Sequence, residues 1–198
     1  MAPMHSIDLD LQTRQILLKA AADTIRHGIA TGQAPASVGP ETLDPRLHRH
    51  EATFVTLKNN GKLRGCIGTL QAKRTLLDDV VFNAFAAAFC DPRFRAVDSN
   101  DVDNLQISVS LLGPRAAMSV RSEAELIRQL NVGIDGLILE EDGGISATFL
   151  PAVWESLPRP EDFVIQLKRK AGIRDAYWSD TIRFYRYRTF TFSNFPAE

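Results

Sequence analysis

The sequence predicts an α+β protein of two subdomains, each built from a β-hairpin, a helix and a strand, with a further helix at the N-terminus. Alternating apolar residues indicate short strands, and turn sequences rich in Asn, Asp and Gly join these strands in pairs. Apolar residues at helical spacing follow each pair. The same order of elements recurs in both halves of the 198-residue chain. We therefore expect one domain with antiparallel or mixed sheets, its subdomains spanning about 1–120 and 121–198.

The N-terminal helix is predicted over residues 10–31. Its apolar residues recur every three or four positions, which is typical of a helix with one buried face. Asp10 supplies a capping side chain at the start, and Gly32 is suited to the position that follows the last turn. Residues 33–52 contain three prolines and are expected to form a loop.

In the first half, strands are predicted over 53–58 and 63–67, a helix over 75–90 and a third strand over 105–112. The Asn-Asn-Gly sequence between the first two strands is a strong hairpin signal, because both residue types tolerate positive φ. A three-residue loop would place Phe54 opposite Cys66, whereas a two-residue loop would shift the pairing by one position.

The second half repeats this order. Strands over 137–141 and 145–150 flank an Asp-Gly-Gly turn, and a short helix over 122–130 precedes them. A helix over 160–171 and a final strand over 182–192 follow. We expect the two hairpin–helix–strand units to meet over a groove, since clefts between similar subdomains are common ligand sites.

The most informative stretch is Leu63-Arg64-Gly65-Cys66-Ile67-Gly68. On a strand, Arg64 and Cys66 would share one face, and a nearby cation favours the nucleophilic thiolate. Cys66 is therefore a candidate catalytic nucleophile, with Arg64 as the residue that activates it. Gly65 and Gly68 are candidate ligand-binding residues, because their backbone N–H groups could face a developing oxyanion.

A second interpretation of this stretch is structural. Free cysteines are among the most buried residue types and most act as small core hydrophobes. Cys90, which ends an apolar helix, is expected to lie in the core, so that Cys66 would be the more reactive thiol. No histidine neighbours Cys66 to serve as a base. Whether the chain is an enzyme or a binding domain thus stays open.

The turn Asp91-Pro92-Arg93-Phe94 follows the same helix. Pro92 ends the helix, and Asp91 with Arg93 forms either a local ion pair or part of a ligand site. We include Asp91 and Arg93 among the candidate ligand-binding residues. Their proximity to Cys66 requires that the loop after Gly68 fold back.

Composition excludes several classes. The net charge of −1 gives no general attraction to nucleic acids or anionic membranes, and no apolar run approaches the roughly 18 residues of a membrane span. The basic, aromatic stretch over 168–188 is read as a solvated helix face and an edge strand, which does not favour nucleic-acid binding. Only His48 and His50 have the spacing of metal ligands, so we expect no metal and no cofactor. Two cysteines and the lack of a signal peptide favour a cytoplasmic protein.

The hexapeptide around Cys66 resembles the hallmark of the AMMECR family, which is protein A of the bacterial AmmeMemoRadiSam system. The resemblance covers nearly the whole chain. Lys168 is a departure, since many members carry a cysteine there. The further matching motifs are Asp91-Pro92-Arg93-Phe94, Ile107-Ser108-Val109-Ser110, Gly133-Ile134-Asp135-Gly136-Leu137, Phe149-Leu150-Pro151, and Lys170-Ala171-Gly172 with Trp178.

The resemblance implies a cytosolic α+β protein of two subdomains but no settled reaction. The name of the system pairs this domain with a Memo-type protein and a radical S-adenosylmethionine protein, which are therefore the expected partners. The resemblance thus implies a ligand- or partner-binding component of a modification or metabolic pathway. The alternative is an enzyme that uses Cys66 as nucleophile on a small molecule or peptide.

Overall fold

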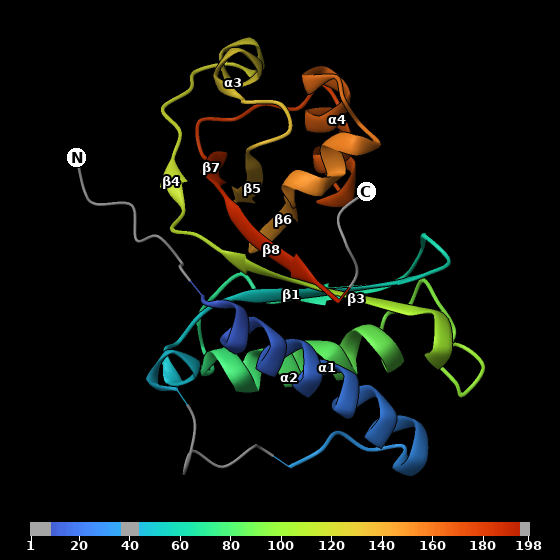
Figure 1. Cartoon of the computed structure of the whole chain (residues 1–198). Helices are drawn as coiled ribbons and strands as arrows, with labels where there is room; N and C mark the ends of the chain where they lie inside the picture. Colours follow the sequence, from blue (N-terminus) through green and yellow to red (C-terminus); the bar gives the residue numbers. More distant parts are fainter. Residues whose placement is uncertain (1–8, 37–43, 195–198) are drawn as a thin grey trace. The chain divides into compact units, whose positions relative to one another are not determined.

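The computed structural model describes residues 9–36 and 44–194, and these form two compact units. The larger unit contains residues 9–112 together with 190–194. The smaller unit is Gly113–Thr189. Each contains helices and a four-stranded sheet, which confirms the predicted α+β class (Figure 1).

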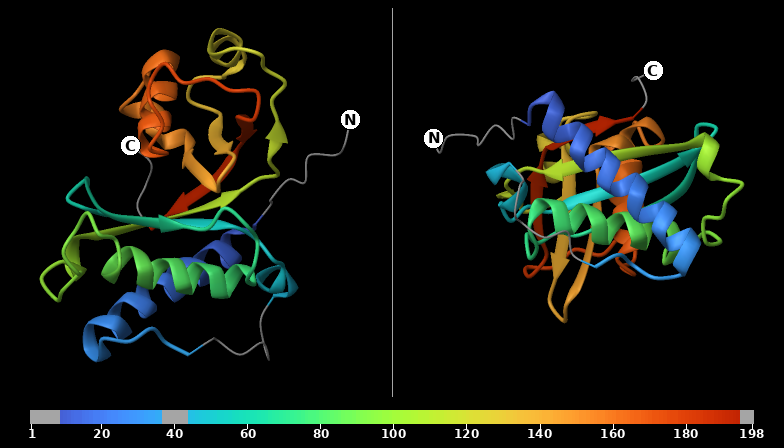
Figure 2. Two further views of the ribbon diagram at one scale, coloured as in Figure 1. Left: turned by 180° about the vertical axis from the view of Figure 1, so that it is seen from behind. Right: turned by 60° about the horizontal axis from the view of Figure 1, so that its bottom comes forward.

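In the larger unit, helices α1 and α2 cover one face of a sheet with the strand order β2-β1-β3-β8 (Figure 2). Short 3₁₀ turns at Pro45–His48 and Val102–Asn104 precede β1 and β3. The elements are α1 (Leu11–Thr31), β1 (Thr53–Asn59), β2 (Lys62–Gly68), α2 (Leu76–Phe89), β3 (Leu105–Leu112) and β8 (Thr189–Ser193).

The ends of both helices follow from local sequence. Asp10 accepts a hydrogen bond from the N–H of Thr13, and Thr75 does the same for Asp78, so each helix starts at a capped residue. Gly32 closes α1 with a φ of 71°, which glycine adopts without strain. These observations confirm the helices predicted from residues 10 and 75.

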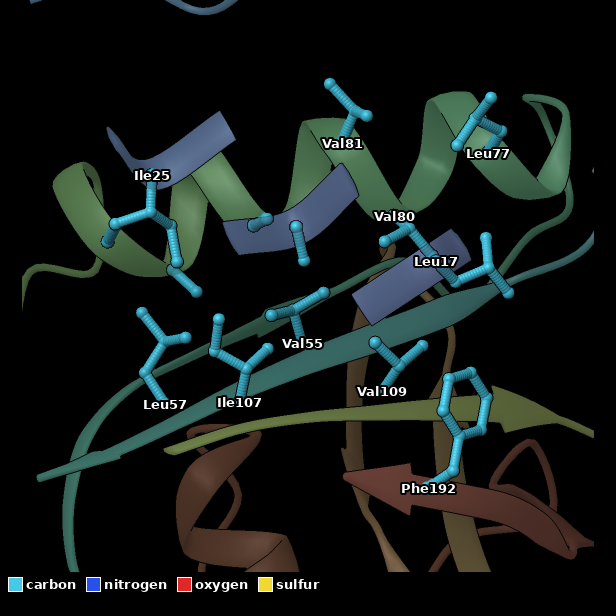
Figure 3. Close-up of a cluster of buried hydrophobic side chains, with 14 of the residues drawn as sticks. Leu17, Ile25, Val55, Leu57, Leu77, Val80, Val81, Ile107, Val109 and Phe192 are labelled. Carbon is cyan, nitrogen blue, oxygen red and sulfur yellow. The ribbon is translucent and has the colours of Figure 1, made fainter. Parts of the chain in front are cut away.

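The core of the larger unit lies between the helices and the sheet (Figure 3). Leu17 and Ile25 of α1 and Val80 of α2 meet the side chains that β1 and β3 direct towards them. Phe192 adds an aromatic ring from β8, more than 75 residues after β3. Because strand side chains alternate between faces, the other face of this sheet carries a different set of residues.

The smaller unit has the strand order β4-β7-β5-β6. Its core includes the stacked rings of Trp154 and Phe163, whose centroids are 3.7 Å apart. A 3₁₀ turn, Pro151–Glu155, leads from β6 towards α4. The elements are β4 (Ala116–Ala117), α3 (Glu123–Gln129), β5 (Gly136–Glu141), β6 (Ile145–Phe149), α4 (Pro160–Lys170) and β7 (Arg183–Tyr187).

The repeat seen in the sequence has a counterpart in topology. Each unit has a hairpin whose first strand is central, with the second hairpin strand on one side and the post-helix strand on the other: β2-β1-β3 and β6-β5-β7. Each sheet gains a fourth strand, β8 beside β3 and β4 beside β7. The smaller unit is thus a contiguous insertion, and the N–H of Gly113 donates to the carbonyl of Arg188 at 2.8 Å, which joins its two ends.

Two boundaries differ from the expectation. The chain divides at Gly113 instead of near residue 120, and residues 190–194 return to the larger unit. The single strand expected over 182–192 is two strands, β7 and β8, in different sheets. No glycine or proline marks the change of sheet, and the alternation of apolar and polar residues is interrupted only at Phe184-Tyr185 and at Arg188-Thr189.

Among the described residues, no helix is long and apolar enough to cross a membrane.

Candidate functional site

The β1–β2 hairpin places Thr56, not Phe54, opposite Cys66. Its loop has two residues, Asn60 and Gly61, and both have positive φ, so Asn59 pairs with Lys62. A β-bulge then shifts the register, because Arg64 is an extra residue between the paired Leu63 and Gly65. Of the two loops that the sequence left open, the two-residue loop is therefore the one observed, and the bulge, which the strand pattern does not indicate, shifts the pairing by one further position.

Gly65 and Gly68 allow close packing on opposite faces of β2. A Cβ atom at Gly65 would lie well under 3.0 Å from the backbone carbonyl oxygen of Ala87 in α2, and one at Gly68 would overlap the ring of Phe54. Neither glycine has a positive φ. These contacts account for both glycines without any ligand, so their proposed role as oxyanion donors has no support from this geometry.

Cys66 lies on β2, the edge strand of its sheet. Its backbone N–H and carbonyl oxygen point away from β1, and the side chains of Asp91 and Arg93 bind them. Its N–H donates to Oδ2 of Asp91 at 2.9 Å. Nη2 of Arg93 donates to its carbonyl oxygen at 3.2 Å. The loop after α2 thus brings the Asp91–Arg93 turn to Cys66, so the structure assembles these three candidate residues at one place.

Asp91 and Arg93 also bind each other. Nε and Nη2 of Arg93 donate to the two carboxylate oxygens of Asp91 at 2.9 and 2.7 Å, which is the bidentate arrangement of strong ion pairs. The Arg93 guanidinium lowers the pKa of Asp91 from 3.8 to about 2, helped by the N–H groups of Cys66 and Arg93 and opposed by burial. In return, the pKa of Arg93 is raised, chiefly by Asp91 and to a smaller degree by Cys66.

Arg64 has a different role from the one expected. Its guanidinium donates to the carbonyl oxygens of Arg95 and Ala96 and pairs with Asp101 at 2.9 Å. The side chains of Arg64 and Asp101 are only 11% and 7% exposed. Arg64 therefore fixes the segment after α2 against the bulge, and the cation that interacts with Cys66 is Arg93.

A buried carboxylate fixes the end of the motif. Asp79 of α2 accepts hydrogen bonds from the N–H and hydroxyl of Thr53, from the hydroxyl of Thr69 and from the amide of Asn83. Thr69 directly follows Gly68. These bonds tie both ends of the β1–β2 hairpin to α2, and no local sequence pattern indicates them.

Neutral hydrogen-bonding side chains line the face of this sheet that α1 and α2 leave uncovered. Thr56 pairs with Cys66 on one side and with Ser108 on the other, so the three form a row across β2, β1 and β3. The Thr56 hydroxyl lies 3.4 Å from Sγ of Cys66. In the next row, the Ser110 hydroxyl lies 2.8 Å from that of Thr191 in β8.

The row contains two residues that the sequence prediction missed, Thr56 and Ser108. The alternation around Ser108 predicted only a strand with one buried face, whereas its polar side contributes Ser108 to this row. Both residues and Cys66 are half-buried. Thiols and hydroxyls can each donate and accept a hydrogen bond, so this row offers neutral contacts for a ligand.

The described residues give the Cys66 thiol one hydrogen-bonding partner, the Thr56 hydroxyl. His50 instead forms a backbone bridge with Thr75 at the start of α2. Within residues 9–36 and 44–194, no three Cys, His, Asp or Glu side chains are placed to hold a metal ion. A nucleophilic thiol is commonly activated by a neighbouring base, and no base among the described residues is hydrogen-bonded to Sγ of Cys66.

Cys90 does not lie in the core as expected. It ends α2 and is exposed, whereas Cys66 is half-buried. The apolar residues before Cys90 predicted burial, but Cys90 directly follows the last helical residue, Phe89, and is exposed where the chain turns towards Asp91.

Lys168, the departure from the expected cysteine, is buried and structural. Its ammonium pairs with Glu123 of α3 and donates to the carbonyl oxygens of Asp175 and Tyr177 at 2.9 and 2.8 Å. Its three N–H donors thus all have partners, and they hold α4 to α3 and to the following loop.

Comparison with known proteins gives a consistent result. The AMMECR1 family model matches residues 18–192. A protein of Methanothermobacter thermautotrophicus is 34% identical over 75% of this chain and 78% of its own length. A Sulfolobus acidocaldarius protein is 32% identical over 86% of this chain and 76% of its own length. The crystal structure of the uncharacterized protein PH0010 from Pyrococcus horikoshii superposes with a TM-score of 0.81 and 29% identity, covering 90% of this chain and 89% of that one.

Proposed function

Because this chain belongs to the AMMECR1 family, we propose that it is a binding component of an AmmeMemoRadiSam-type pathway, whose ligand contacts Cys66, Thr56 and Ser108. Its protein partners in this proposal are a Memo-type protein and a radical S-adenosylmethionine protein. Three of the motifs on which the family resemblance rests meet around this row: those containing Cys66, Asp91 and Ser108.

The observation that carries the proposal is that the charges around Cys66 are already paired. Arg93 is bound to Asp91, and Arg64 is bound to Asp101. What remains for a ligand is a row of one thiol and two hydroxyls. A charged ligand would lose hydration and could gain only a charge that another side chain already neutralises, so the favoured ligand is uncharged and rich in amide or hydroxyl groups.

A titration of the ¹⁵N-labelled protein with three small probes tests the ligand class. N-methylacetamide should shift the backbone amide signals of Cys66, Thr56 and Ser108, whereas acetate and methylammonium at equal concentration should not. Thr56→Val removes a hydroxyl at nearly constant volume and should weaken the response. Ser146→Ala, at an exposed position on β6, is the matched control. No response to N-methylacetamide, or a stronger response to either ion, would refute the ligand class.

The second candidate function is an enzyme with Cys66 as nucleophile, and the incomplete burial of this residue beside the Thr56 hydroxyl favours it. Iodoacetamide labelling separates the two, with the exposed Cys90 as internal reference. A thiol that serves only for binding should label more slowly than Cys90, because Cys66 is less accessible. If Cys66 reacts faster than Cys90 although it is less accessible, its thiol is activated, and this result would support the enzyme hypothesis.

The pathway assignment has a separate test. The Memo-type and radical S-adenosylmethionine proteins encoded in the same genome are purified and mixed with this protein, and sedimentation velocity measures association. We expect a complex with at least one of them. If both sediment independently, the partner assignment fails, whereas the ligand class remains for the titration to decide.

A further inference from the structure

The backbone of Cys66 is held in an unusual way. In an antiparallel sheet, a residue that faces a neighbouring strand exchanges an N–H···O and an O···H–N bond with one residue opposite. β2 has a neighbour on one side only. On its open side, the Asp91 carboxylate accepts from the Cys66 N–H, and the Arg93 guanidinium donates to the Cys66 carbonyl oxygen. The ion pair thus supplies both bonds that a further strand would supply.

These two bonds fix the direction of the thiol. The N–H of Cys66 belongs to the peptide group before its Cα, and its carbonyl belongs to the peptide group after it. Holding both groups restricts φ and ψ of Cys66 and therefore the direction of its Cα–Cβ bond. The restraint matters here because the Arg64 bulge, two residues earlier, interrupts the ladder and increases the local twist.

The two ion pairs along this strand edge differ in exposure. Arg64 and Asp101 are almost completely buried. Arg93 is 55% exposed, although its partner Asp91 is 2% exposed. The Arg64–Asp101 pair is therefore an internal part of the fold. In the Asp91–Arg93 pair, Arg93 lies at the surface, so its substitution removes few packing contacts.

We propose that the Asp91–Arg93 pair is a positioning device that holds the Cys66 backbone, aims its thiol at Thr56 and limits access to it. This inference rests on the proposed function, since it concerns the same site. Asp91 and Arg93 then act through Cys66 and not by direct contact with a ligand. Loss of the pair frees the Cys66 peptide groups and lets the thiol leave the row.

Arg93→Ala tests the proposal, with Arg95→Ala as its control. Arg95 lies in the same loop, is 60% exposed and pairs with Asp98 and Asp101 instead of touching Cys66. Two quantities are measured without any ligand: hydrogen exchange of the Cys66 amide and its iodoacetamide labelling rate relative to Cys90. Arg93→Ala removes the donor to the Cys66 carbonyl oxygen and the partner that holds the Asp91 carboxylate in place, so the bond from the Cys66 N–H to Asp91 should open more often. Exchange should then speed about tenfold, the fold-change that corresponds to about 1.4 kcal/mol, and the relative labelling rate should rise. Arg95→Ala should change neither.

Arg93→Lys provides the conservative variant. A lysine keeps the charge but cannot bind Asp91 and the Cys66 carbonyl with one planar fork, so both rates should fall between those of the wild type and Arg93→Ala. Equal exchange and labelling of Cys66 in Arg93→Ala and Arg95→Ala would overturn the proposal. Because neither measurement uses a ligand, equal rates in the two variants would leave the binding proposal intact. Conversely, a failed N-methylacetamide titration would leave the positioning role of Asp91 and Arg93 intact.

Discussion

Replacing Gly65 by alanine tests whether this glycine serves packing. The new Cβ would lie well under 3.0 Å from the Ala87 carbonyl oxygen, a distance that real Cβ contacts essentially never reach. That oxygen belongs to the backbone of α2, so no side-chain rotation can relieve the overlap. Either α2 must move away from β2 or the strand must bend beside the bulge.

The expected cost follows from two opposing effects. Overpacking a core costs about 1–3 kcal/mol, and a rigid backbone neighbour places this site at the upper end. Replacing glycine by alanine also restricts the unfolded chain, which returns about 0.4–1 kcal/mol. We therefore expect Gly65→Ala to lower the free energy of unfolding by about 2 kcal/mol or more. Gly68→Ala meets the ring of Phe54, which can rotate, so its cost should be smaller.

Urea unfolding followed by far-ultraviolet circular dichroism measures both variants. The midpoint should fall further for Gly65→Ala than for Gly68→Ala, with similar slopes. A Gly65→Ala protein within about 0.5 kcal/mol of the wild type would show that α2 does not constrain this position, since that is the range of neutral surface substitutions. Gly65 would then again be a candidate for binding a ligand through its backbone.

Three further predictions concern distant parts of the chain. Truncation after Arg188 removes β8 and Phe192, so it should lower the melting temperature of the larger unit even though these residues follow the smaller unit in sequence; unchanged amide protection in α1 would contradict this. Lys168→Met should cost about 2 kcal/mol in urea unfolding, because the carbonyl oxygens of Asp175 and Tyr177 lose their donor, whereas Glu123 is 32% exposed and can be hydrated; a stability equal to the wild type would refute it. The pKa of Asp91 is lowered from 3.8 to about 2, so its contribution to stability is complete above about pH 4 and is lost as pH falls to about 2. Exchange of the Cys66 amide, corrected for intrinsic pH dependence, should accelerate across that window in the wild type but not in Asp91→Asn.

The elements with local signals could be predicted from sequence. Capping by Asp10 and Thr75 and the positive-φ hairpin residues depend on neighbours within four positions, so the helices and both hairpins were recognised. The change of sheet at Arg188 has only a weak signal, the consecutive polar residues Arg188 and Thr189, and a single strand tolerates such an interruption as well. The pairing of β8 with β3 is what establishes two strands.

The candidate site was predictable in part, for a related reason. The motif drew attention to Cys66, and the turn after the helix drew attention to Asp91 and Arg93, which the structure joins by hydrogen bonds. The role assigned to Arg64 assumed a regular strand, in which it would share a face with Cys66. Its bonds to Asp101 and two carbonyl groups are tertiary and accompany a bulge that the strand pattern does not encode.

The ion pairs also show why a functional interpretation from residue types alone is ambiguous here. A cysteine, two arginines and two aspartates within one region would fit an acid–base site if each were free to meet a substrate. In this protein, Asp91 and Arg93 bind the backbone of Cys66, and Arg64 binds Asp101 beneath the neighbouring loop. Their charges therefore order the strand edge and leave the thiol among hydroxyl groups. If the ligand is uncharged, as we propose, the ligand titration and the thiol labelling address the function more directly than a screen for hydrolytic activity.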